Sequence, residues 1–174
     1  MKRVFFTTAM LFAIFSCANA QKAFDESSKV LSLGVGFGSP YWPTGFSSSL
    51  PVNPTLTFEK AVTDQISAGT TFAYSSTKYY DYDIRFNAVY LGGRGAYHFS
   101  IPNEKVDLYA GAGLGYAIVF VSSKYGSTWG ASSGLAYSLF GGGRYYFSKR
   151  VAAYAELGYG SFSVANVGLS ISSK

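Results

Sequence analysis

Large apolar residues recur at every second position along most of the chain. From residue 31 to residue 38 the odd positions are Leu, Leu, Val and Phe, whereas the even positions are Ser or Gly. The same alternation runs through residues 106–121, 135–147 and 166–172. A period of two is typical of β-strands whose two faces differ chemically. The pattern therefore predicts strands with one apolar face and one face of small residues.

The alternation divides the chain into segments that each supply the roughly 9 to 11 residues with which a tilted strand crosses a bilayer. The eight predicted strands are residues 29–38, 52–60, 66–76, 84–99, 106–121, 134–147, 151–160 and 163–172. Three connections are long and rich in Ser, Gly, Tyr and Pro, namely 39–51, 77–83 and 122–133. Three others are short, namely 61–65, 100–105 and 148–150. Long loops at one end and tight turns at the other are typical of outer-membrane barrels.

The side that carries the large apolar residues separates a membrane barrel from a soluble one. A soluble barrel such as a lipocalin holds its large apolar residues inside. Here the large apolar face repeats in every strand, and the opposite face holds Gly, Ser, Thr, Ala and Tyr with a few charges. Side chains can fill the interior of an eight-stranded barrel. We predict an all-β fold, an eight-stranded antiparallel up-and-down transmembrane β-barrel, with a secreted soluble β-barrel as the alternative.

Composition agrees with this interpretation. Of the 174 residues, 48% are hydrophobic and 18% aromatic, but only 13% are charged, against the roughly 25% that is usual for soluble domains. Beyond the N-terminal end, no run of about 18 apolar residues occurs that could form a membrane helix. The 20 glycines suit the crowded inner face of a small barrel.

Residues 1–20 have the parts of a secretory signal peptide. Lys2 and Arg3 form a positive start, residues 4–17 are mostly apolar, and Ala18-Asn19-Ala20 is an A-x-A cleavage site. We predict cleavage after Ala20 and a mature barrel domain over residues 21–174. Cleavage would lower the net charge from +5 to +3, and nothing in this balance indicates nucleic-acid binding.

Cys17 is the only cysteine, and it would leave with the signal peptide. The mature chain would then contain no disulfide, so another kind of interaction must hold the fold together. A lipoprotein cleavage site ending at Cys17 is an alternative, but bulky Phe15 fits such a site poorly and the A-x-A site competes with it.

Two stretches of the chain repeat each other. Residues 93–116 and 143–159 both read Gly-Arg, aromatic residues, Phe-Ser, a turn, V-x-x-Y-A and Leu-Gly-Tyr. With residues 63–69 (TDQISAG), these stretches make the chain similar to small bacterial outer-membrane β-barrel proteins. The family is the broad porin-like group with OmpX- and OmpW-like members, in a version that resembles those of Bacteroidota. The resemblance covers nearly all of the mature chain.

This resemblance implies an outer-membrane protein surrounded by lipid and lipopolysaccharide, and we expect a monomer. Lys78 and Arg85, in or beside a long connection, could contact lipopolysaccharide phosphates. The resemblance also implies insertion by the barrel-assembly machinery. Family members commonly finish with an aromatic residue in the last strand, whereas this chain ends in Leu169-Ser170-Ile171-Ser172-Ser173-Lys174. The chain departs from the family's insertion signal at this point.

Five charged residues fall on the small-residue face, and the strand directions place all five in the half nearest the tight turns. They are Glu59, Arg94, Asp107, Arg144 and Glu156. Charges held away from bulk water must pair, and Arg suits two-pronged contacts with carboxylates. We expect a salt-bridge network that fills and rigidifies the lumen, with a proton or solute relay as the alternative.

The sequence predicts no cofactor, no metal site and no catalytic centre. His98 is the only histidine, so the mature chain lacks a His/Cys metal cluster. We expect His98 to pair with Asp107 in the same hairpin rather than to serve a hydrolase. The glycine runs 111–113 and 141–143 lack the helix that must follow a phosphate-binding loop.

Aromatic side chains gather in or beside the long connections. They are Trp42, Tyr79, Tyr80, Tyr82, Tyr125 and Trp129. Such residues form girdles at membrane interfaces, or they recognise an extracellular ligand such as a sugar, a protein or a phage. We expect a non-enzymatic envelope protein with a structural or surface-interaction role. A narrow porin-like channel for ions or small apolar solutes is the alternative, and an envelope enzyme is a more distant one.

Overall fold

The computed structural model describes residues 23–38, 52–79, 84–123, 126–159 and 162–173. The predicted signal peptide lies outside these residues, so its cleavage site stays a prediction. Among the described residues, no helix is long and apolar enough to span a membrane.

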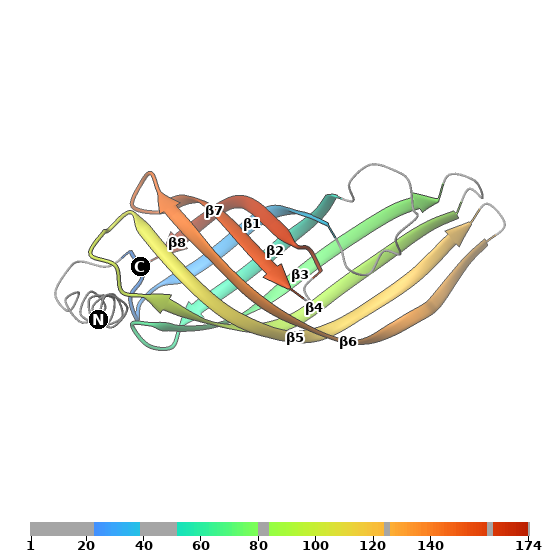
Figure 1. Cartoon of the computed structure of the whole chain (residues 1–174), viewed down its shortest axis with the longest axis horizontal. Coiled ribbons are helices and arrows are strands. Elements are labelled where there is room, and N and C mark those ends of the chain that lie inside the picture. The colour runs from blue at the N-terminus through green and yellow to red at the C-terminus, as the bar shows by residue number, and fades with distance from the viewer. Residues whose placement is uncertain (1–22, 39–51, 80–83, 124–125, 160–161, 174) are drawn as a thin grey trace, which may run out of the picture.

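Eight antiparallel strands form a closed barrel, in which each strand pairs with the next and the last pairs with the first (Figure 1). The strands are β1 (Lys29–Phe37), β2 (Val52–Ala61), β3 (Ile66–Tyr79), β4 (Ile84–Phe99), β5 (Val106–Ser123), β6 (Gly126–Tyr146), β7 (Val151–Tyr159) and β8 (Ala165–Ser173). The barrel closes where Leu33 of β1 lies opposite Leu169 of β8. This architecture confirms the predicted eight-stranded antiparallel up-and-down barrel.

The expected loop over residues 122–133 is wrong. β5 continues to Ser123 and β6 begins at Gly126, and the two strands stay paired there, with Ser122 opposite Ser127. The register shifts between Val119 and Val121. Ser, Thr and Gly lack the apolar alternation that marks a strand facing lipid, but their backbones can still continue a hairpin ladder. For the same reason β3 runs to Tyr79, beyond its expected end at residue 76.

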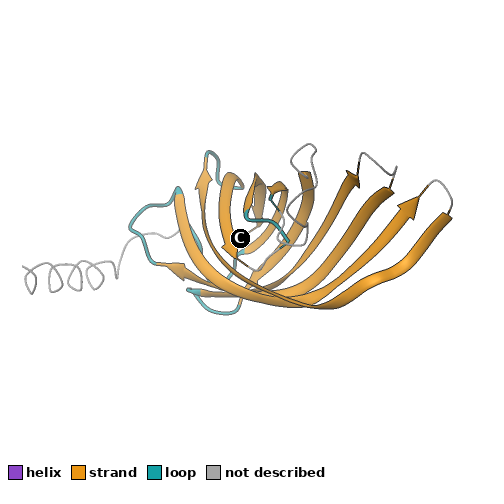
Figure 2. Ribbon diagram, turned by 45° about the vertical axis from the view of Figure 1, so that its right-hand side comes forward, coloured by secondary structure: helices purple, strands orange, loops and turns teal. Residues whose placement is uncertain are grey.

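The wall of the barrel is uneven in height. β1, β7 and β8 have 9 residues each, whereas β5 has 18 and β6 has 21. Figure 2 shows the long strands rising well beyond the short ones on one side of the molecule. All eight strands therefore form the wall at the end with the tight turns, whereas only β3 to β6 continue toward the opposite end.

The two faces of the wall differ as the alternation predicts. Large apolar side chains point outward and are exposed on every strand, for example Leu33 on β1, Leu114 on β5 and Leu157 on β7. The inner face holds buried hydroxyl, alanine, tyrosine and charged side chains. Several inner glycines make room for the tyrosines, because a Cβ atom on Gly168 would lie 2.8 Å from Cε1 of Tyr154.

Candidate functional site

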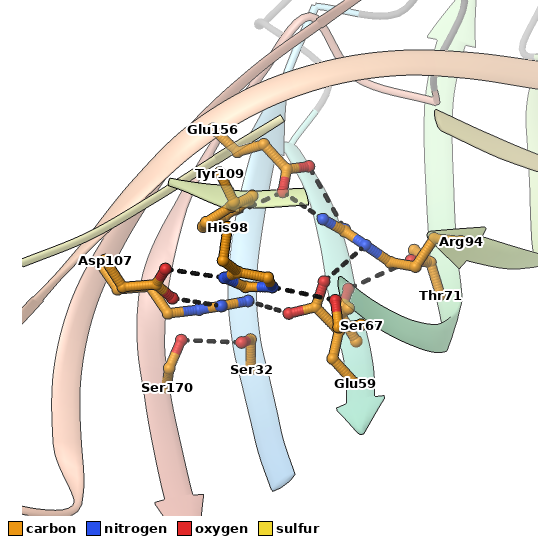
Figure 3. A network of polar contacts seen from close by, with 12 residues as sticks. Ser32, Glu59, Ser67, Thr71, Arg94, His98, Asp107, Tyr109, Glu156 and Ser170 are labelled. Carbon is orange, nitrogen blue, oxygen red and sulfur yellow. Dashed lines mark hydrogen bonds and ion pairs between the residues drawn. The ribbon is translucent and has the colours of Figure 1, made fainter. Parts of the chain in front are cut away.

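Five charged side chains from five strands meet inside the barrel, in the half nearest the tight turns. Figure 3 labels four of them, Glu59, Arg94, Asp107 and Glu156. Arg94 Nε lies 3.0 Å from Glu59 Oε1, and Arg94 Nη2 lies 2.8 Å from Glu156 Oε2. Arg144 Nη1 lies 3.0 Å from Asp107 Oδ2, and its Nη2 forms an ion pair with Glu59 Oε2. The order of contacts across the lumen is therefore Asp107, Arg144, Glu59, Arg94, Glu156.

Glu59 is the centre of this network because its two carboxylate oxygens face two different guanidinium groups. Its side chain is 1% exposed, and that of Arg144 is 2% exposed. A buried charge is tolerated only when its partners and hydrogen bonds are well arranged. β2, which carries Glu59, is thereby tied across the lumen to β4 and β6, neither of which is its neighbour in the sheet.

Aromatic rings cover both guanidinium groups. The Arg94 guanidinium carbon lies 3.8 Å from the centre of the Phe140 ring, and that of Arg144 lies 4.4 Å from the centre of the Tyr109 ring. Both distances are within the range of cation–π attraction. The Tyr109 hydroxyl also donates to Glu156 Oε2 at 3.2 Å. Charges, rings and a hydroxyl together fill this part of the lumen.

His98 extends the network toward the turn end. Its Nδ1 lies 2.7 Å from Asp107 Oδ1, and its Nε2 lies 3.0 Å from the Ser67 hydroxyl. His98 therefore contacts Asp107 within the β4–β5 hairpin, and both of its ring nitrogens have partners. The order Asp–His–Ser is also that of hydrolase triads. Here all three side chains are buried and Ser67 is only 1% exposed, so its hydroxyl is not open to a substrate in this structure.

The segment before β1 enters the barrel at the same end. Phe24 is buried and stacks on His98, with ring centres 3.6 Å apart and planes 1° from parallel. Ala23 packs with Tyr146 and Ala152. The Ser28 carbonyl accepts a hydrogen bond from the Ala61 amide at 2.9 Å. Sequence reasoning missed this segment, because residues 23–28 have no alternation and only Phe24 is large and apolar.

Beyond the charges, toward the long strands, the interior holds a cluster of small and aromatic side chains: Ala73, Ala88, Tyr90, Ala117, Ala136 and Phe162. Buried polar side chains such as Asn53, Ser75 and Asn87 share this part of the interior. Phe162 precedes β8, and its carbonyl accepts a hydrogen bond from Asn53 Nδ2 at 3.2 Å. A cavity of about 40 Å³ lies between this cluster and the Arg94–Glu156 pair. It is large enough for a few water molecules, each of which needs about 10–15 Å³.

Most of the aromatic residues predicted in or beside the long connections lie outside the described residues. These are Trp42, Tyr80, Tyr82 and Tyr125. Tyr79 is the last residue of β3. Trp129 belongs to strand β6 rather than to a loop. Within the described ranges, no three His, Cys, Asp or Glu side chains are grouped as a metal site would require.

The fold and the filled interior define a class of protein, the small closed barrels of eight antiparallel strands. Solved structures of this kind match most of the chain. OprG, an outer membrane protein of Pseudomonas aeruginosa, is 10% identical with a TM-score of 0.61, over 89% of this chain and 99% of OprG. Neisserial surface protein A is 13% identical with a TM-score of 0.58, over 84% of this chain and 95% of that protein.

Ail, the attachment invasion locus protein of Yersinia pestis, is 17% identical with a TM-score of 0.52, over 84% of this chain and 95% of Ail. No family model matches the chain, and neither does any curated protein. At these identities the likeness shows the fold. Evidence about function has to come from the chain's own residues.

Proposed function

We propose that this chain is a non-enzymatic outer-membrane β-barrel protein with a closed lumen and a structural or surface-interaction role in the bacterial envelope. The observation that carries the proposal is the outward belt of large apolar side chains, which continues around all eight strands. Monomeric soluble proteins rarely expose apolar patches beyond a few hundred Å². Lipid is the surrounding that makes such a belt favourable, and a closed barrel leaves no unpaired strand edge in it.

The location follows from the same argument. The chain is exported with its signal peptide, cleaved after Ala20, inserted by the barrel-assembly machinery, and surrounded as a monomer by lipid and lipopolysaccharide. The tight turns then face the periplasm, and the far ends of β3 to β6 lie on the extracellular side. Fractionation of cell membranes, followed by gel electrophoresis with and without boiling, tests this. A folded barrel migrates differently before boiling, and a protein found only in the soluble fraction would contradict the proposal.

The closed lumen rests on the ion-pair network and on Phe24. Arg94 and Arg144 each join carboxylates that come from different strands, and the Phe24 ring covers His98 at the turn end. A water-filled pore needs a continuous path, and contacts that cross the lumen in this way support a closed one. Planar-bilayer recordings of the refolded protein should show no steady single-channel steps, whereas regular steps from the native protein would rule out a closed lumen.

A narrow channel is the second candidate, and the cavity between Arg94, Glu156 and Phe162 favours it. Its lining combines charged and hydroxyl side chains with the aromatic rings of Tyr90, Phe140 and Phe162. If the lumen opens there, Phe162→Ala should raise conductance or solute flux over the native protein. If conductance and solute flux with Phe162→Ala equal those of the native protein, the channel proposal is rejected in favour of the closed barrel.

The length of β3 to β6 suits a role in surface interaction. One solved structure holds Ail with the heparin analogue sucrose octasulfate, so a barrel of this size can present a ligand site. For this chain we propose Trp42, Tyr79, Tyr80, Tyr82, Tyr125 and Trp129 as recognition residues for an extracellular ligand. Replacing them together by Ser should abolish surface binding of such a ligand and leave the heat-modifiable mobility intact.

A further inference from the structure

Two lysines lie directly opposite each other on the outer face of the barrel at its turn end. Lys29 begins β1, Lys60 is next to the last residue of β2, and the two are cross-strand partners. Both are exposed, and they share the outward face with Leu31 and Phe58. The ammonium groups therefore stand where the apolar belt ends.

Like charges placed directly opposite in a sheet repel each other. No ion pair among the described residues involves either lysine. The other cross-strand neighbour of Lys29 is Ser173, and that of Lys60 is Ala68. Neither neighbour carries an acidic side chain, so the described part of the sheet does not neutralise the pair.

The strand pairs that continue from the lysines are apolar. Leu31 lies opposite Phe58, and Leu33 lies opposite Leu56. All four side chains are exposed on the outer face. Two cations at the rim followed by two rows of large apolar residues match the shape of a phospholipid, which has an anionic head and long apolar chains.

The rest of the turn-end rim is built differently. On β4 and around the end of β6 the outward residues are aromatic, and Tyr97 packs edge to face on Phe99 with ring centres 5.4 Å apart. Tyr145 and Phe147 are likewise exposed. Aromatic girdles position a barrel in the membrane interface without selecting a headgroup charge. Lys105, Lys149 and Arg150 are also exposed at this end, but they lie in the β4–β5 and β6–β7 turns. Lys29 and Lys60 instead lie opposite each other on paired strands, at the edge of the apolar belt.

We propose that Lys29 and Lys60 bind the phosphate of an anionic phospholipid, whose acyl chain lies along Leu31, Phe58, Leu33 and Leu56. The inference rests on the proposed membrane location. Lysine binds phosphate as a point charge, and its long stem lets the ammonium reach the interface while the methylene groups stay on the apolar surface. Two positive charges favour a headgroup with net negative charge, such as phosphatidylglycerol, over the zwitterionic phosphatidylcholine.

The test uses the full mature chain refolded in vesicles of equal parts phosphatidylglycerol and phosphatidylcholine. After mild detergent extraction, native mass spectrometry counts the lipids that remain bound. The unaltered chain should keep phosphatidylglycerol at least 5-fold over phosphatidylcholine, and the double variant Lys29→Gln/Lys60→Gln should lose this preference. The control Lys149→Gln/Arg150→Gln removes two charges from the exposed β6–β7 turn at the same end and should keep it.

Three results would overturn the lipid site: no preference in the unaltered chain, equal loss in the control, or retention of the preference in the Lys29/Lys60 variant. A doubled mass that disappears with Lys29→Gln/Lys60→Gln would assign the lysines to a second copy of the chain instead. Heat-modifiable mobility is measured on every sample. A barrel that inserts without lipid preference rejects the lipid site alone, whereas a chain that never inserts rejects the proposed membrane location as well.

Discussion

The outer and inner faces of the same strands are governed by different physics. On the outer face, side chains such as Leu33, Leu114 and Leu157 contact no other part of the chain that would bury them. On the inner face, Glu59 and Arg144 are almost fully buried and are held by specific partners. The outer face therefore needs a suitable surrounding, and the inner face needs suitable pairing.

This difference teaches where the chain tolerates change. An outward position accepts any apolar side chain of reasonable size, because lipid adapts to its shape. An inward position depends on a partner from a strand far away in the sequence, such as the 85 residues that separate Arg144 from Glu59. Substitutions that put an apolar side chain in place of a buried charge, or a charge on the outer face, should therefore lower the free energy of unfolding most.

The largest effect is expected for Arg144→Leu. The change leaves Glu59 and Asp107 buried without their shared cation, and breaking a buried ion pair in this way costs about 3–5 kcal/mol. Denaturant titration of the protein refolded in vesicles measures the free energy of unfolding. Arg144→Lys keeps the charge but cannot reach both carboxylates in the same way, so it should lose less. A loss below about 1 kcal/mol for Arg144→Leu would show that the network does not hold the barrel together.

A charge placed on the outer face should cost somewhat less. Leu114 lies in the middle of β5 and is 62% exposed. Arginine on the lipid face near the bilayer midplane costs about 2–4 kcal/mol, and near the interfaces about 0–1 kcal/mol. The same titration should therefore show a large loss for Leu114→Arg and a small one for Phe147→Arg at the turn end. Equal, small losses would indicate that water rather than lipid surrounds Leu114.

Filling space on the inner face should have a moderate effect. A Cβ atom on Gly92 would lie 2.6 Å from Cζ of Tyr90, whereas a Cβ atom on Gly134 would have no atom within 4 Å. Overpacking of this kind costs about 1–3 kcal/mol. Gly92→Ala should lower the unfolding temperature and Gly134→Ala should not. If the two variants unfold alike, the inner glycines do not act by making room for tyrosines.

The smallest effect is expected for Phe24→Leu. Leucine keeps an apolar side chain at the turn end but removes the ring that stacks on His98. Aromatic pairs contribute about 0.5–1.5 kcal/mol beyond the area that they bury, so the free energy of unfolding should fall by that amount. In a double-mutant cycle with His98→Gln, the two losses should be less than additive. Full additivity would mean that Phe24 is held by the wall and not by the histidine.

Much of the inner arrangement is accessible to sequence reasoning, because side chains alternate across a strand. The period of two puts Glu59, Arg94 and Glu156 on the inward face, and the strand direction gives their approximate depth. The choice of partners is not accessible in this way. It depends on how far neighbouring strands are staggered and on which side chains reach across the lumen, as Arg144 does to Glu59.

The segment before β1 and the far end of the β5–β6 hairpin show where sequence reasoning fails for the backbone itself. Residues 23–28 have no strand pattern, and their place becomes visible only once the barrel offers Phe24 a buried ring to stack on. Residues 126–133 are rich in Ser and Gly and look like a loop, but pairing with β5 holds much of this stretch as a strand. Backbone hydrogen bonds to a neighbour do not require an apolar pattern.

The sequence by itself determined the eight strands, the direction of their apolar faces and the closed antiparallel barrel, because these follow from a local period and from turn positions. The tertiary structure alone decided that Glu59 bridges two arginines, that Phe24 covers His98, and that a cluster of alanine and aromatic side chains lies beyond the charges. Those contacts join residues far apart in the chain, and only the curvature and closure of the sheet bring them within reach.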